Sequence, residues 1–100
     1  MSSDYAWEKL HSAVLGLVGL GSLQERLSNV SSYSFLTLRS EDFPENLQSR
    51  FNNVVETLEG DRAMSLSDVK AQEVAEEIVS IYDELAQIQG AKYQTSLSEE

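Results

Sequence analysis

The amino-acid sequence predicts an all-α protein, a compact antiparallel bundle of about four helices. Three observations carry this prediction. Apolar residues recur at steps of three and four in four separate segments, which is the spacing of one face of a helix. Only one residue in 100 is proline, so few positions interrupt a helix. The segments between the apolar stripes are short and contain Gly, Pro or Ser, and short loops favour antiparallel neighbours in a bundle.

The first helix is expected over residues 4–20. Ser2, Ser3 or Asp4 can cap its N-terminus, since short polar side chains accept hydrogen bonds from the first amides of a helix. Gly21 is expected to end it, because glycine readily adopts the backbone conformation that terminates helices. One face of this helix is apolar, and its residues are Trp7, Leu10, Val14, Leu17 and Val18.

The second helix is expected to begin at Ser22 and to reach residue 38. Ser22 and Glu25 have the spacing of a capping box, in which each side chain accepts a hydrogen bond from the backbone of the other residue. Residues 31–38 are also rich in types that favour strands, which leaves their conformation open. We expect a helix there, because a single strand would find no partner in this chain. The stripe of this helix is Leu23, Leu27, Val30, Ser34 and Leu38.

The third helix is expected to follow a loop at residues 39–44. Asp42 is the predicted N-cap, and Pro44 lies in the first turn, where a helix does not need its missing amide hydrogen. Gly60 is expected to end the helix. The apolar stripe consists of Leu47, Phe51, Val54, Val55 and Leu58.

The fourth helix has the most regular pattern in the chain. Ser65 or Ser67 is expected to begin it, and Gly90 is expected to end it. Its apolar seam alternates steps of three and four, which predicts a position at the centre of the bundle. The seam is Ala71, Val74, Ile78, Ile81, Leu85 and Ile88. The sequence thus predicts one helical domain over residues 1–90, followed by a disordered acidic tail over residues 91–100.

The charge balance excludes several classes of function. The chain has 17 acidic and 7 basic residues, a formal net charge of −10, whereas a sequence-independent nucleic-acid binder needs surplus Lys and Arg. It contains no Cys and one His, which excludes disulfides, thiolate metal sites and any site built on two imidazoles. The longest apolar run, residues 13–20, is shorter than the roughly 20 residues that span a bilayer. We therefore predict a cytoplasmic protein that binds neither nucleic acid nor membrane.

No catalytic, cofactor-binding or metal site is predicted, and we expect no enzyme. Residues 16–22 match the glycine spacing of a phosphate-binding loop, but the required Lys is missing and no strand precedes them. His11 has no partner base or nucleophile that the sequence announces, so a partly exposed structural role is expected. The acidic residues of the fourth helix are interpreted as a hydrated face, with weak Mg²⁺ or Ca²⁺ binding as the alternative. They are Glu73, Glu76, Glu77, Asp83 and Glu84.

Three short segments resemble a group of small uncharacterised bacterial helical proteins. They are residues 21–27, with the sequence GSLQERL, residues 41–45, with the sequence EDFPE, and the pair Arg50 and Phe51. The resemblance covers about the first 60 residues and consists of helix caps and core positions. It implies a bacterial helical protein, but it implies no activity and no functional residue.

The sequence favours a protein–protein interaction module, a small helical protein that binds another protein or itself. This hypothesis rests on the missing chemistry and on apolar residues outside the main stripes. The alternative is an acidic inhibitor that mimics nucleic acid and blocks a basic cleft, for which the net charge of −10 is the reason. An enzyme or small-ligand carrier is the third hypothesis, and no motif supports it.

The apolar residues outside the stripes lie on the first two predicted helices. A two-fold dimer buries such a patch against its own copy, which is the commonest symmetric arrangement. The contact should avoid the acidic fourth helix, because two copies bring like charges together. We therefore expect a homodimer, or another protein, to use this surface. Its predicted members are Leu15, Leu20, Tyr33, Phe35 and Leu36.

Overall fold

The computed structural model describes residues 2–98, and within this range it describes the side chains of residues 5–88. The described residues contain no strand and four α-helices: α1 (Ser2–Gly16), α2 (Leu23–Asn29), α3 (Glu45–Leu58) and α4 (Asp68–Ser98). Three shorter helical turns lie in the connections: η1 (Val30–Ser34), η2 (Ser40–Asp42) and η3 (Arg62–Ser65). The prediction of an all-α bundle of about four helices is confirmed.

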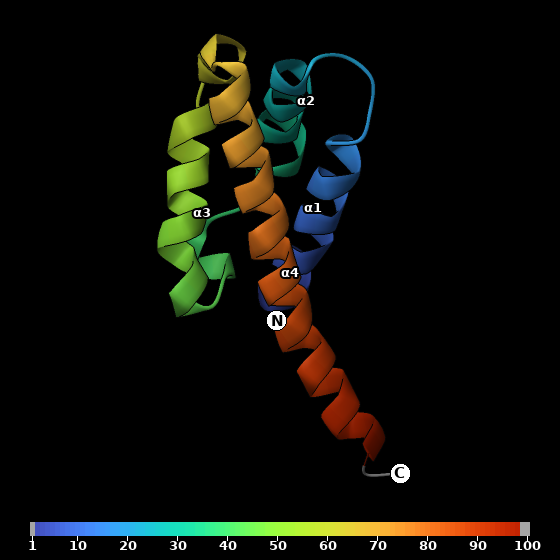
Figure 1. The fold of residues 1–100 in the computed structure, drawn as a ribbon. Coiled ribbons are helices and arrows are strands. Elements are labelled where there is room, and N and C mark those ends of the chain that lie inside the picture. Colours follow the sequence, from blue (N-terminus) through green and yellow to red (C-terminus); the bar gives the residue numbers. More distant parts are fainter. Residues whose placement is uncertain (1, 99–100) are drawn as a thin grey trace.

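The central helix is α4. It contacts α1, α2 and α3, and Figure 1 shows it running along the middle of the bundle with α3 on one side and α1 on the other. Five of the six residues of its predicted seam are buried, and Ile88 is half-buried. The same core holds Leu10 of α1, Leu27 of α2 and Phe51 of α3. The apolar stripes of all four helices therefore meet in one core around α4.

The first helix ends earlier than predicted, at Gly16 rather than near residue 20. The Leu17 amide bonds the carbonyls of Ala13 and Val14 at 3.1 Å each, and the chain then turns. Glycine lowers helix stability by about 1 kcal/mol relative to alanine, and two glycines fall within four residues here. As a result Leu17 is buried, whereas Val18 is 77% exposed although the helical stripe included it.

The second helix begins as predicted. The Glu25 amide donates to Ser22 Oγ at 3.1 Å, and the Ser22 amide donates to Glu25 Oε1 at 2.8 Å, so both halves of the capping box form. This box satisfies two amides that have no partner within the helix. It fixes the start of α2 at Leu23.

The end of the second helix differs from the prediction. α2 passes at Val30 into the π-helical turn η1, in which the Phe35 amide bonds the Val30 carbonyl at 3.1 Å. The wider turn brings both Ser34 and Phe35 into the core, and the Ser34 hydroxyl donates to Ser12 Oγ at 3.3 Å. The chain then leaves the helix at residues 35–39, which form neither helix nor strand. The helix predicted to reach residue 38 therefore ends at Ser34.

The predicted Asp42 cap of the third helix is wrong. Asp42 ends η2, and its Oδ2 accepts the Arg39 amide at 2.9 Å rather than an amide of α3. Phe43 is extended, as expected for the residue before a proline, so α3 begins only after Pro44. The apolar stripe is nevertheless correct. Its buried members are Leu47, Phe51, Val54 and Leu58.

The fourth helix begins where predicted and continues further. Gly60 turns the chain after α3 with a φ of 61°, and Ser67 Oγ accepts the Lys70 amide at 3.1 Å. Gly90 does not end α4, which continues to Ser98, because one glycine costs a helix only about 1 kcal/mol. Figure 1 shows the last turns extending beyond the bundle. Residues 91–98 continue α4 as a helix, and residues 99–100 lie outside the described range. The division of the chain into a domain of residues 1–90 and a tail of residues 91–100 stays a prediction.

Candidate interaction surface

The five residues of the predicted interaction surface are divided between the surface and the core. Phe35 is 6% exposed and packs edge-on against Phe51, with ring centroids 5.4 Å apart. It is therefore a core residue, because the π turn directs it inward, and its assignment to a surface was wrong. The other four are more than half exposed, and they are Leu15, Leu20, Tyr33 and Leu36.

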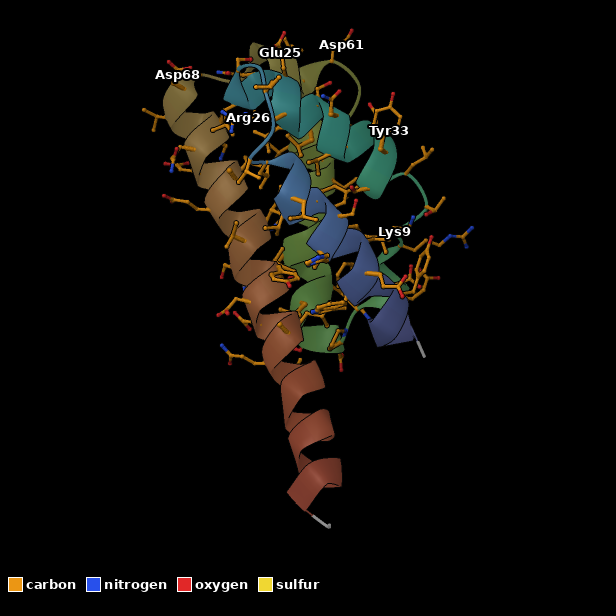
Figure 2. All side chains as sticks on the ribbon, turned by 90° about the vertical axis from the view of Figure 1, so that its right-hand side faces the viewer. Lys9, Glu25, Arg26, Tyr33, Asp61 and Asp68 are labelled. Atoms are coloured by element: carbon orange, nitrogen blue, oxygen red, sulfur yellow. The ribbon has the colours of Figure 1, made fainter. Side chains whose placement is uncertain are left out.

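These exposed residues do not form one patch. Figure 2 shows Tyr33 on the outer side of η1, on the side of α1 that faces away from α4. The turn that carries Leu36 is attached to the start of α1 by a hydrogen bond between the hydroxyl groups of Tyr5 and Thr37. Leu20 lies instead in the loop between α1 and α2. The predicted surface thus separates into two parts of the molecule.

An open groove of about 400 Å³ lies where the loop between α1 and α2 passes α4. Its apolar lining comes from two distant places in the sequence, Leu17 with Leu23 and Ala75 with Val79. Its polar lining consists of Arg26, Gln72 and Glu76. The groove is therefore lined by four apolar and three polar or charged residues, a composition found in many recognition sites.

Hydrogen bonds hold the loop beside the groove in place. The Arg26 guanidinium donates to the carbonyl of Leu17 and, at 3.4 Å, to the carbonyl of Ser22, so it binds both ends of the loop. Gly21 has a φ of 97°, and a Cβ atom added there would lie 2.6 Å from Glu25 Oε1. Only glycine therefore fits this position without strain. Contacts within the chain therefore fix the backbone of this loop.

One exposed apolar side chain lines the groove, and two more lie in the loop between α1 and α2. Val18 and Leu20, in the loop, are 77% and 97% exposed. Val79 lines the groove from α4 and is 44% exposed. Single exposed apolar residues are common on proteins, whereas a contiguous exposed apolar patch is typical of interaction surfaces. Val18 was predicted to belong to the buried stripe of the first helix, and no prediction was made for Val79.

Three aromatic side chains extend the contact between α1 and α4. Trp7 and His11 stack with ring centroids 5.2 Å apart and planes 11° from parallel. His11 Nδ1 lies 3.2 Å from the Tyr82 hydroxyl, one turn of α4 beyond Val79. The contact with the Tyr82 hydroxyl orients the His11 ring, and none of the described hydrogen bonds of His11 involves a carboxylate. The spacing of Trp7 and His11 was visible in the sequence, but their partner on α4 was not.

On its other side, α4 is joined to α3 by an ion-pair cluster. Arg50 Nε lies 2.7 Å from Glu77 Oε2, one terminal nitrogen lies 2.8 Å from Ser80 Oγ, and the other donates to Glu84. The hydrogen bond to Glu77 raises the pKa of Arg50 above its ordinary value, more than burial lowers it. The same bond lowers the pKa of Glu77 below its ordinary value of 4.5.

The acidic residues of α4 are thus not one hydrated face. Glu77 and Glu84 are half-buried against Arg50, which sequence reasoning missed. They are two helical turns apart and lie on one side of α4, a spacing that could have indicated a shared cation. The three that remain exposed are Glu73, Glu76 and Asp83.

Comparisons with protein-family models, with curated proteins and with solved structures gave no match. No helix in the described part of the chain is both long enough and apolar enough to cross a membrane. Among the residues that the structure describes, no group of three His, Asp or Glu side chains is placed to hold a metal ion. A functional interpretation therefore depends on the groove and its surroundings.

Proposed function

We propose that this chain is a protein–protein interaction module that acts in the cytoplasm without catalysis of its own. The groove beside the loop between α1 and α2 is the proposed binding site. The observation that carries this proposal is an open groove of about 400 Å³ whose apolar lining includes Val79, a side chain that is 44% exposed. Removing such side chains from water contributes about 25 cal/mol per Å² of apolar surface, which favours a partner that covers them.

The fixed backbone of the loop supports this proposal. Binding costs free energy when loops and side chains must be ordered, and a surface that is already ordered avoids part of this cost. Here the Arg26 guanidinium, the Ser22–Glu25 capping box and the positive φ of Gly21 hold the loop before any partner arrives. The groove is therefore suited to binding without a large rearrangement.

The other hypotheses have less support. A homodimer through the predicted patch loses Phe35 to the core, and Tyr33 lies on the side of α1 that faces away from α4 (Figure 2). Mimicry of nucleic acid requires an uncompensated acidic surface, yet Arg50 engages two of the six acidic residues of α4. Neither hypothesis is favoured by a specific contact.

The proposal is tested with two matched variants of α4. Val79→Arg places a charged side chain in the groove, whereas Val69→Arg makes the same change on the same helix at a residue that is 70% exposed and does not line the groove. The wild type and both variants are immobilised and exposed to a lysate of the source cells, and retained proteins are quantified by mass spectrometry. We expect one or more proteins to be retained by the wild type and by Val69→Arg but lost with Val79→Arg. If no protein distinguishes Val79→Arg from the wild type, the groove is not the binding site.

A further inference from the structure

We infer that the segment bound in the groove is a basic amphipathic helix of another protein. This inference rests on the proposed function and specifies the chemistry of its partner. Three features lead to it: the shape and lining of the groove, the charges beside Val79, and the charge of a second copy of this chain.

The carboxylates beside Val79 have no basic partner among the side chains that the structure describes. Glu76 precedes Val79 by three residues and Asp83 follows it by four, so one helical turn separates Val79 from each. Both are exposed, and each accepts a hydrogen bond from a neutral side-chain amide, at 3.1 Å from Gln72 and at 3.0 Å from Gln87.

The described cations are engaged elsewhere. Among the described side chains, the ion pairs of Lys and Arg involve Glu73, Glu77 and Glu84, and none involves Glu76 or Asp83. On α4, Val79 therefore lies between two exposed carboxylates, of which Glu76 also lines the groove. A partner with Lys or Arg on both sides of an apolar residue matches this pattern.

The groove accepts a helix better than a strand. In helix-in-groove recognition, the apolar face of an amphipathic helix enters the groove and main-chain hydrogen bonds remain within the helix. A strand would instead need a sheet edge to pair with, and the described residues contain no strand. Glu76 and Asp83 are about 10 Å apart along α4, the rise of two helical turns. A partner helix can therefore place two basic residues near them and one apolar residue between.

Arg26 determines which edge of the groove takes the basic residues. It lines the groove from α2, opposite to the acidic edge of α4, and its guanidinium is turned to the carbonyls of Leu17 and Ser22. A second cation beside Arg26 is disfavoured by like-charge repulsion. We therefore expect Lys or Arg on the α4 edge of the bound helix, and neutral or acidic residues on its α2 edge.

A second copy of this chain does not have this chemistry. Its net charge is −10, and a two-fold contact sets the same surface of one copy against that of the other. Glu76 and Asp83 of one copy would then face acidic residues of the same kind. The charge of the groove edge thus favours a basic partner over self-association.

A displayed library of helical peptides tests the inference directly. Each peptide of about 18 residues carries a fixed leucine stripe, and the flanking positions are randomised over acidic, basic and neutral residues. Peptides are selected on the wild type and depleted on Val79→Arg. We expect Lys and Arg to be enriched on one edge of the stripe only. Enrichment of acidic or neutral residues there, or the absence of any peptide that depends on Val79, overturns the inference.

The best selected peptide is then measured by fluorescence anisotropy against two double variants of equal charge. Glu76→Gln with Asp83→Asn removes the acidic edge of the groove, and Glu56→Gln with Glu59→Gln removes two exposed charges of α3 and its end. We expect the first pair to weaken binding about tenfold and the second to leave it within about twofold. Equal weakening by both pairs means that only the net charge attracts the peptide, and the inference is then wrong.

The two proposals fail in different ways. A protein captured through Val79 whose binding is unchanged by Glu76→Gln with Asp83→Asn leaves the groove as the binding site and excludes a basic partner. If no captured protein distinguishes Val79→Arg from the wild type, the groove itself is not the binding site. The salt dependence of binding adds an independent measurement. Raising the ionic strength from about 0.05 M to about 0.5 M should weaken the binding of a basic helix and leave the binding of a neutral helix nearly unchanged.

Discussion

The two sides of α4 differ in how far their side chains find partners within the chain. On the α3 side, Arg50 gathers Glu77, Ser80 and Glu84 into one cluster, and the polar groups that approach the core find partners within the chain. On the α1 side, Val79 is 44% exposed beside an open groove. The same helix therefore closes one edge with charge and leaves the other open.

This difference separates residues that hold the fold from residues that are available for binding. A cluster satisfied within the chain contributes to stability and has little left to offer a partner. An exposed apolar residue contributes little to stability and gains on being covered. The predictions that follow vary the core, the loop and each edge of α4, from the largest expected change in stability to the smallest.

The largest effect is expected at the core that both edges share. Ile81 is 1% exposed, and Ile81→Ala removes buried methyl groups and leaves a cavity. We expect a loss of about 2–5 kcal/mol in the free energy of unfolding, measured from urea denaturation. Ile88→Ala is the matched control, because Ile88 is only half-buried and should lose less. Equal losses would mean that α4 is not centred as the structure places it.

The next effect concerns the loop beside the groove. Gly21→Ala forces a side chain into a φ of 97° and brings its Cβ to 2.6 Å from Glu25 Oε1. A residue with a Cβ loses about 1–2 kcal/mol in this left-handed region, so the urea midpoint should fall. Gly19→Ala is the control, since its Cβ would meet its nearest described atom, the Gly16 carbonyl oxygen, at 3.4 Å and its φ is not positive. A neutral Gly21→Ala would show that the loop is not held as described.

A smaller loss is expected on the closed edge of α4. Arg50→Met keeps the length of the side chain but removes its hydrogen bonds to Glu77 and Glu84. Partly exposed ion pairs contribute little individually, so we expect about 1 kcal/mol for the whole cluster. Arg62→Met is the control, because Arg62 donates to a backbone carbonyl and forms no ion pair among the described side chains. If the two variants unfold at the same urea concentration, the cluster does not stabilise the α3 edge.

The closed edge should also weaken in acid. The Arg50 hydrogen bond lowers the pKa of Glu77 below its ordinary value of 4.5, so the folded state favours the ionised carboxylate. A depressed pKa stabilises the fold above the ordinary value, and this stabilisation is lost as the pH falls below about 4.5 through the folded-state pKa. Urea midpoints measured across that window should therefore fall more steeply in the wild type than in Arg50→Met. Parallel curves would contradict the assignment to Glu77.

Regular patterns were predictable from the sequence where one local signal dominated. The seam of α4 has an unbroken helical period, and the Ser22–Glu25 box needs only its own spacing, so both were predicted correctly. The boundary at Asp42 was wrong because the proline two residues later forces Phe43 to be extended. The start of α3 therefore depended on a competing local rule.

The binding surface was predictable only in part. The exposure of Leu20 and Tyr33 followed from their positions off the stripes, but Phe35 moved into the core through a π turn that leaves no clear sequence signal. The groove joins Leu17 of α1's end to Val79 of α4, and sequence periodicity cannot show whether two distant apolar residues meet closely or leave a space. The charged cluster was missed for the same reason, since its cation lies on another helix.

The smallest change in stability is expected at Val79, and it tests most directly whether the groove side of α4 is open. Val79→Arg removes little buried surface, because Val79 is 44% exposed, and it places a cation one turn from both Glu76 and Asp83. Such helical pairs stabilise by about 0.2–0.5 kcal/mol each, which offsets the lost apolar contact. We therefore expect the free energy of unfolding to stay within about 0.5 kcal/mol of the wild type in urea denaturation. A loss of stability comparable to that of Ile81→Ala would mean that Val79 is packed as tightly as a core residue. The side of α4 that faces α1 would then leave no open surface for a partner.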